Sequence, residues 1–178
     1  MAHLHIWAQN NFQGIRAFGR TFQRVTEGKS KFEVPIIHQS TVRLGNEQLS
    51  QCNYAMLRHR ETPNLQVIIL SDNDYRIEPT SWLSNSIRTL VGIAEFCPGT
   101  AILCISLLSD RNYYIEEEKA RIKQIIESSP KHFFVDIGGE LEPSDLSQTK
   151  YLSEMGVRKV TRILLKVIMG TPVSAFLE

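Results

Sequence analysis

The sequence predicts a doubly wound α/β domain, in which helices cover both faces of a parallel sheet. Five short apolar segments alternate along the chain with segments in which apolar residues recur at helical spacing. Two of the five segments are almost wholly apolar, as expected for strands that are covered on both faces. With 178 residues the chain is long enough for one hydrophobic core and short for two, so residues 1–178 are predicted to form a single domain.

The predicted strands form a five-stranded parallel sheet of the flavodoxin-like, three-layer α/β/α type, in the order 2-1-3-4-5. Right-handed crossovers between successive strands place helices on each face of this sheet. In such folds ligands bind beyond the carboxyl ends of the strands. The predicted strands are residues 4–8 (LHIWA), 32–37 (FEVPII), 65–70 (LQVIIL), 100–108 (TAILCISLL) and 131–137 (KHFFVDI).

Four segments have the apolar spacing of amphipathic helices. The last of them, from Ser153 to about Met169, carries its apolar residues on one broad stripe. The apolar positions are Ile15, Phe18, Phe22 and Val25 in the first segment; Leu83, Ile87, Leu90, Val91 and Ala94 in the second; Ile115, Ile122, Ile125 and Ile126 in the third; and Val157, Val160, Ile163, Leu164, Val167 and Ile168 in the last.

Composition and charge favour a soluble globular protein. The formal net charge is +1, so the chain as a whole has no strong attraction for ions of either sign. No apolar run approaches the ~20 residues that span a bilayer, and the N-terminus lacks the pattern of a signal peptide, so a cytoplasmic protein without membrane partners is expected. The cysteines, Cys52, Cys97 and Cys104, lack ligand or redox spacing and predict neither disulfides nor a zinc site. We expect no metal and no cofactor.

A polar cluster directly follows the third predicted strand. It consists of Ser71, Asp72, Asn73 and Asp74, at the edge of the sheet where ligands bind. The cluster resembles the Gly-x-Asn-Asp block of the SGNH (GDSL) hydrolases, which lies at the end of the third strand in that family. The resemblance implies that Asn73 stands where the family's asparagine donates a hydrogen bond to the developing oxyanion of an ester.

The other SGNH blocks follow in order but without their catalytic residues. After the first strand, Asn10 stands where the family has its nucleophilic serine. The segment 148–156 (QTKYLSEMG) matches the flanks of the family's last block, but Gln148 replaces the aspartate and Tyr151 the histidine. Acyl transfer needs a hydroxyl that is activated by a base, and a carboxylate that orients the base. The resemblance therefore implies a hydrolase scaffold without a catalytic triad, in which Asn10, Asn73, Gln148 and Tyr151 are degenerate positions.

An active esterase with a divergent triad stays an alternative. A shifted register would bring Asp145 near the site, with Ser147 or Ser153 beside it. No histidine lies in this segment, because the five histidines are at positions 3, 5, 38, 59 and 132. An inactive domain is therefore the favoured interpretation.

Basic residues are concentrated at four-residue spacing on the first and last predicted helices, and no acid lies between Asn10 and Thr26 or from Met155 to Gly170. In the order 2-1-3-4-5 these helices lie side by side on one face of the sheet, where their cations would form one surface that neutralises phosphates. Lys150, beside the degenerate last block, is a further candidate for a phosphate contact. The predicted RNA-binding residues are Arg16, Arg20, Arg24, Lys150, Arg158, Lys159, Arg162 and Lys166.

Over nearly its whole length the chain resembles the triad-less SGNH-like domains of insect germ-plasm proteins. This resemblance implies a domain without enzymatic activity that binds germ-line mRNA, in its 3′ untranslated regions, in the germ plasm or germ granules of the cytoplasm. It implies germ-plasm proteins as further partners and no small-molecule substrate. Two alternatives stay open: a protein-interaction scaffold whose basic face is incidental, and charged helix surfaces that are merely solvated.

Aromatic and acidic residues outside these blocks receive structural interpretations. Tyr75, Trp82, Tyr113 and Tyr114 have the chemistry to stack on unpaired bases, but packing in the core or at its rim is the favoured interpretation. The run EEEK at 116–119 is interpreted as a solvated helix start that the helix dipole stabilises.

Overall fold

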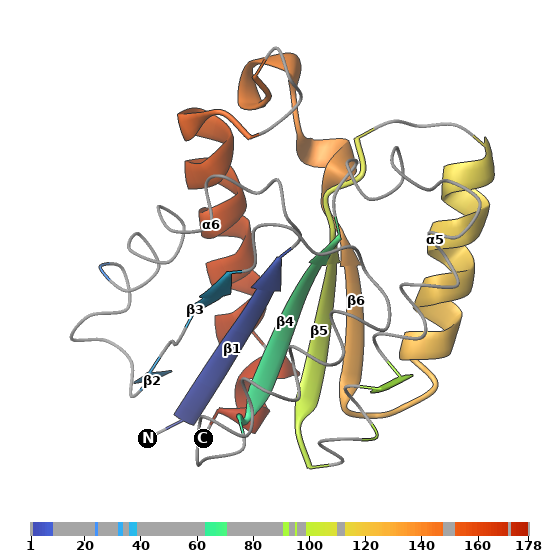
Figure 1. Ribbon diagram of the computed structural model, residues 1–178, viewed down its shortest axis with the longest axis vertical. Coiled ribbons are helices and arrows are strands. Elements are labelled where there is room, and N and C mark those ends of the chain that lie inside the picture. The colour runs from blue at the N-terminus through green and yellow to red at the C-terminus, as the bar shows by residue number, and fades with distance from the viewer. Residues whose placement is uncertain are drawn as a thin grey trace.

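The protein is an α/β structure built on a parallel sheet, as the sequence predicts (Figure 1). The strands in the described part of the chain are β1 (Ala2–Ala8), β2 (Phe32–Glu33), β3 (Ile36–His38), β4 (Leu65–Leu70), β5 (Ala101–Ser106) and β6 (His132–Asp136). The helices whose bounds are described are α5 (Tyr113–Ile126) and α6 (Glu154–Met169), with 3-10 turns η1 (Gly138–Glu140), η2 (Pro143–Asp145) and η3 (Val173–Phe176). The computed structural model describes residues 2–8, 24, 32–33, 36–38, 63–70, 91–92, 95, 99–109, 113–147, 152–170 and 172–177.

The described strands pair in the order β2-β1-β4-β5-β6, and β3 also pairs with β1; each pairing is parallel. Every residue of β4 and β5 is buried, which agrees with their almost wholly apolar sequences. The predicted strand at 32–37 corresponds to the two short strands β2 and β3, and residues 34–35 lie outside the described part of the chain.

Helices α6 and α5 cover opposite faces of the sheet. Val157, Val160 and Leu164 of α6 join the core cluster that contains the odd-numbered residues of β4 and β5. Side chains alternate between the faces of a strand, so the even-numbered residues face the other way. Lys119 of α5 bonds to Asp136, an even-numbered residue of β6, and this contact places α5 on the second face. The described part therefore contains three layers.

The two described helices follow their apolar spacing with one exception. In α5, Ile115, Ile122 and Ile126 are buried as predicted, whereas Ile125 is 42% exposed, so its predicted place on the buried stripe is wrong. Ser153 caps the N-terminus of α6 by accepting a hydrogen bond from the Gly156 amide, which fixes where the helix begins. Among the described residues no helix is both long and apolar enough to cross a membrane.

Candidate nucleic-acid interface

The chain between β6 and α6 packs closely over the carboxyl edge of the sheet. Asp136, the last residue of β6, accepts a hydrogen bond from the Gly138 amide at 3.2 Å, which turns the chain into η1. A Cβ atom on Gly138 would collide with the carbonyl oxygen of Leu108, the second residue beyond β5. Only glycine therefore allows η1 to approach the end of β5 so closely.

Asp145 is the carboxylate at the centre of this segment, and its side chain is only 5% exposed. It accepts hydrogen bonds from the Glu142 amide at 2.9 Å and from Lys159 Nζ at 2.8 Å. The bond from the Glu142 amide, and then the bond from Lys159, hold the pKa of Asp145 below its ordinary value, because both stabilise the charged form. The carboxylate is an anchor between η2 and α6.

The flanks of the last SGNH-like block have structural roles at the same place. Leu152 forms an antiparallel bridge with Leu146. The Ser153 amide donates to the carbonyl oxygen of Asp145 at 2.8 Å. A Cβ atom on Gly156 would collide with that carbonyl oxygen, so glycine allows the first turn of α6 to lie against η2. The leucine, serine and glycine of this block are thus explained by packing alone.

The alternative triad that the sequence leaves open centres on Asp145. In the structure its Oδ2 accepts from Lys159, and its other described partner is a backbone amide. This carboxylate orients Lys159 and the turn η2. A catalytic triad instead requires a carboxylate that orients a histidine. Asn10, Asn73, Gln148, Tyr151 and Lys150 lie outside the described residues, as do Arg16 and Arg20.

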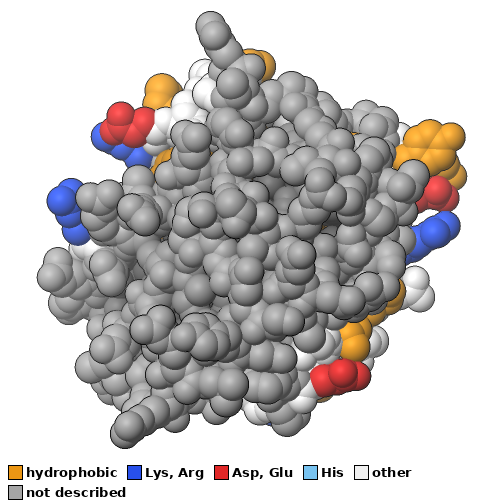
Figure 2. Space-filling model, in the orientation of Figure 1, with side chains coloured by type: hydrophobic (Ala, Val, Ile, Leu, Met, Phe, Trp, Pro, Cys, Tyr) orange, Lys and Arg blue, Asp and Glu red, His pale blue; other side chains and the backbone are white. Residues whose placement is uncertain are grey.

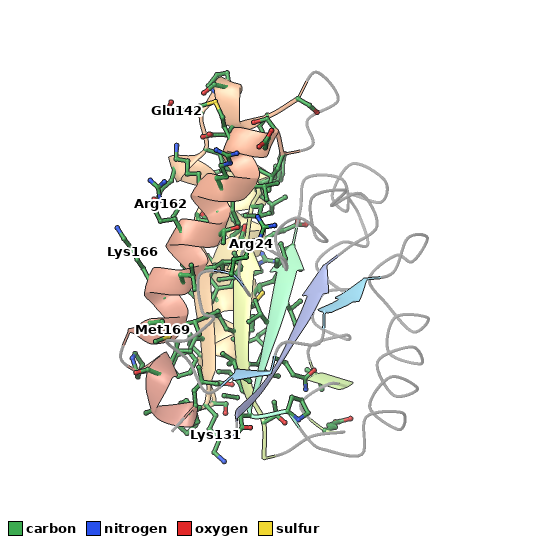
Figure 3. The ribbon with its side chains drawn as sticks, turned by 90° about the vertical axis from the view of Figure 1, so that its left-hand side faces the viewer. Arg24, Lys131, Glu142, Arg162, Lys166 and Met169 are labelled. Atoms are coloured by element: carbon green, nitrogen blue, oxygen red, sulfur yellow. The ribbon has the colours of Figure 1, made fainter. Side chains whose placement is uncertain are left out.

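Arg162 and Lys166 are exposed on α6, one turn apart. Figure 3 shows both side chains on the outward side of the helix, pointing away from the sheet. No carboxylate in the described part of the chain lies within ion-pairing distance of either. Four residues of helix separate the two cations by about 6 Å along the axis. Arg162 and Lys166 are hereafter called the α6 cationic pair.

Arg158 and Lys159 do not extend this cationic surface as the acid-free sequence predicts. The guanidinium of Arg158 lies 2.6 Å from the carboxylate of Glu154, one turn earlier in α6. Lys159, 32% exposed, is held by Asp145 and lies 3.9 Å from Glu142. Glu154 directly precedes the acid-free stretch, and Asp145 belongs to η2. The acid-free stretch by itself therefore does not reveal the carboxylates that balance these two cations.

Arg24 is the one residue of the predicted first basic helix that the structure describes. It is helical and exposed. In Figure 3 it is drawn between α6 and the strands of the sheet, whereas Arg162 and Lys166 point outward from the far side of α6. Arg24 therefore adds an exposed cation from a segment far away in the sequence.

Two structural interpretations made from the sequence are wrong. Tyr113 and Tyr114 do not pack in the core or at its rim, since they are 71% and 70% exposed. Lys119 of the EEEK run is buried rather than solvated, and its ammonium lies 2.7 Å from Glu116 and 2.8 Å from Asp136. Burial alone would lower the pKa of Lys119, but the hydrogen bonds to Asp136 and Glu116 outweigh burial and raise it.

Comparison with solved structures shows that the fold is similar to that of carbohydrate esterases. A family 3 carbohydrate esterase from Clostridium thermocellum matches with a TM-score of 0.76 and 14% identity, over 99% of each chain. A family two carbohydrate esterase from Clostridium thermocellum, in complex with cellohexaose, matches with a TM-score of 0.69 and 11% identity, over 94% of this chain and 63% of the other. An active-site mutant of a family two carbohydrate esterase from Clostridium thermocellum gives a TM-score of 0.71 at 11% identity, over 96% of this chain and 64% of the other. No family model and no curated protein sequence matches the chain.

Proposed function

We propose that the chain is an RNA-binding domain on an SGNH-type hydrolase scaffold that has lost its catalytic triad. The observation that carries the proposal is the α6 cationic pair, which is exposed and has no carboxylate partner in the described part of the chain. Two cations about 6 Å apart along a helix can each neutralise a phosphate of a nucleic-acid backbone. Arg24, which is exposed, is a further cation of the predicted first basic segment.

Arg158 and Lys159 have lesser roles in this proposal than the sequence suggests. Lys159 anchors Asp145, so a phosphate that drew it away would break an interaction of the fold. The Arg158–Glu154 pair is exposed on both sides, and exposed pairs of this kind contribute only about 0 to 1 kcal/mol. RNA can therefore compete for Arg158 at small cost, but Glu154 repels the same phosphates.

The finer parts of the proposal rest on the sequence alone, on its pattern of strands and helices and on the resemblance found in it. They are a five-stranded sheet in the order 2-1-3-4-5, the replacement of the triad by Asn10, Gln148 and Tyr151, and a particular likeness to the C-terminal domain of the insect germ-plasm protein Oskar. That likeness extends the proposal to germ-line mRNA, 3′ untranslated regions and germ-plasm proteins in the cytoplasm.

A direct test measures the affinity of the chain for a fluorescein-labelled single-stranded RNA over a range of salt concentrations. Replacing the α6 cationic pair (Arg162→Glu with Lys166→Glu) should weaken binding and reduce the slope of log K against log salt by about 1.4, because two phosphate contacts are lost. A matched control, Arg121→Glu with Lys123→Glu, makes the same change of charge on exposed residues of α5. Equal losses in both variants, or no loss in the first, would refute the proposed surface.

A second candidate function is an active carbohydrate esterase with a divergent triad, which the structural similarity to carbohydrate esterases favours. The engagement of Asp145 with Lys159 opposes it, because that carboxylate is then not available to a catalytic base. The two candidates differ in turnover of p-nitrophenyl acetate. Appreciable hydrolysis that an Asn73→Ala substitution abolishes would establish the esterase, whereas we expect no enzymatic turnover above the buffer rate.

A further inference from the structure

We propose that the first turn of α5 is a recognition surface for an arginine-bearing peptide of a protein partner. It consists of Tyr113, Tyr114, Glu116 and Glu117, hereafter called the α5 tyrosine surface, and it takes up the guanidinium group between aromatic rings and carboxylates. The proposal is independent of RNA binding, because it concerns a helix on the opposite face of the sheet from α6.

The exposure of the two tyrosine rings is the first observation. Rings of this size normally bury most of their area, yet both are about 70% exposed. In Figure 2 hydrophobic side chains gather at the edge of the molecule that carries α5 in Figure 1, beside acidic and basic ones. Exposed aromatic side chains at a surface otherwise rich in charge mark sites of protein recognition, where tyrosine is enriched.

The geometry of the rings defines what they can hold. Their centroids are 6.0 Å apart and their planes meet at 75°, so the rings stand edge to face, and a cation can approach the ring surface that stays exposed. The Tyr113 hydroxyl donates to Glu117 at 3.0 Å, which fixes this ring against a carboxylate one turn along the helix. The face of an aromatic ring attracts a cation, and aromatic walls combined with carboxylates are the usual way in which proteins enclose organic cations.

The charge around the rings selects a cation over a phosphate. Glu116 and Glu117 both lie on the exposed side of the turn. Two cations offset part of this charge: Lys119, which is buried, is shared between Glu116 and Asp136, and Arg121 lies close enough to act on Tyr113. The helix N-terminus contributes about half a positive charge, which is less than the two carboxylates supply. Nucleic acid is therefore repelled here, and an arginine side chain, which stacks on aromatic rings and bonds to carboxylates at once, is favoured.

The test uses the intact chain and a fluorescein-labelled Arg-Gly repeat peptide, with the citrulline peptide as its uncharged counterpart. Replacing both rings (Tyr113→Leu with Tyr114→Leu) should weaken binding of the arginine peptide roughly tenfold, and so should citrulline in place of arginine, because the cation–π contacts are lost. The paired substitution Tyr113→Phe with Tyr114→Phe keeps the rings and should retain most of the affinity. Gln124→Ala, on an exposed position of the same helix, should change nothing.

The same variants separate this proposal from the proposed function. The double leucine variant should bind single-stranded RNA as the native chain does, and variants of the α6 cationic pair should bind the arginine peptide as the native chain does. Equal affinity for the arginine and citrulline peptides, or an unchanged affinity in the double leucine variant, would overturn the proposal. Failure of the native chain to bind the arginine peptide at millimolar concentration would overturn it as well.

Discussion

Lys159 Nζ lies 2.8 Å from Oδ2 of Asp145, and this ion pair joins the turn η2 to the second turn of α6. In the sequence, Asp145 stands three residues before Gln148, where the block that resembles the SGNH hydrolases begins. The carboxylate of Asp145 is paired with Lys159. This pairing supports the proposal that the last block serves packing and not catalysis. The pair also removes one cation from the surface proposed to bind RNA.

Loss of the Asp145 carboxylate should destabilise the fold. We expect Asp145→Ala to lower the free energy of unfolding by about 2 kcal/mol or more, because it leaves the Glu142 amide and the Lys159 ammonium without their partner. Glu154→Ala removes a carboxylate from an exposed pair and should change the free energy by less than about 1 kcal/mol. Urea unfolding followed by circular dichroism measures both. Similar values for the two variants would show that the Asp145 anchor is no stronger than a surface pair.

The contribution of Asp145 should depend on pH in one direction. Its pKa is lowered in the folded chain, so folding favours the ionised form. The stabilisation is then fully present above its ordinary pKa of about 3.9 and is lost as pH falls through the lower folded value. The difference in unfolding free energy between the native chain and Asp145→Asn should be constant from pH 7 to pH 5 and shrink toward pH 3. An undiminished difference at pH 3 would contradict this assignment.

The sequence predicts those features that depend on local periodicity, and it fails where distant residues decide. Val157, Val160, Leu164 and Ile168 are buried as their spacing predicts, because the face of a helix is set by residues within a few turns. Lys119 and Lys159 were expected at the surface, and both are anchored by aspartates 17 and 14 residues away. Burial of a charge depends on such a tertiary partner, which periodicity cannot identify.

The aromatic residues show the opposite error. Large rings usually contribute to the core, so Tyr113 and Tyr114 were expected to pack. Their exposure depends on where α5 begins relative to the sheet, since its buried face starts only at Ile115. Two consecutive residues just outside that face have no core to enter.

Gly156 should tolerate no side chain. Alanine favours a helix over glycine by about 1 kcal/mol, but its Cβ would collide with the backbone carbonyl of Asp145, and overpacking against backbone costs about 1 to 3 kcal/mol. The destabilisation from the collision should exceed the gain in helix propensity, because neither the turn η2 nor the capped start of α6 is free to move away. We expect Gly156→Ala to be destabilised, whereas Gly99→Ala, where a Cβ meets nothing within 4 Å, should be neutral or slightly stabilised. Thermal unfolding of the two variants gives the comparison, and equal melting temperatures would contradict it.

Cys104 should be chemically inert while the chain is folded. It is fully buried in β5, and burial raises the pKa of its thiol far above the ordinary value, so almost no thiolate forms. In a variant with Cys52→Ser and Cys97→Ser, Ellman's reagent should not react at pH 8 until denaturant unfolds the chain. Rapid reaction of the folded variant would place Cys104 at an accessible position and contradict the packing of β5.

Removing the Glu154 carboxylate should strengthen RNA binding, if the proposed function is correct. Arg158 lies one turn before Arg162 on α6, and its guanidinium is paired with Glu154. Glu154→Gln frees that cation and removes a repulsive charge, so affinity should rise and the slope of log K against log salt should increase in magnitude by about 0.7, as for one further phosphate contact. Glu127→Gln is the matched control, since it makes the same change at an exposed position directly after α5. An equal gain in both variants would mean that net charge alone governs binding, and no gain in either would mean that RNA does not approach the first turns of α6.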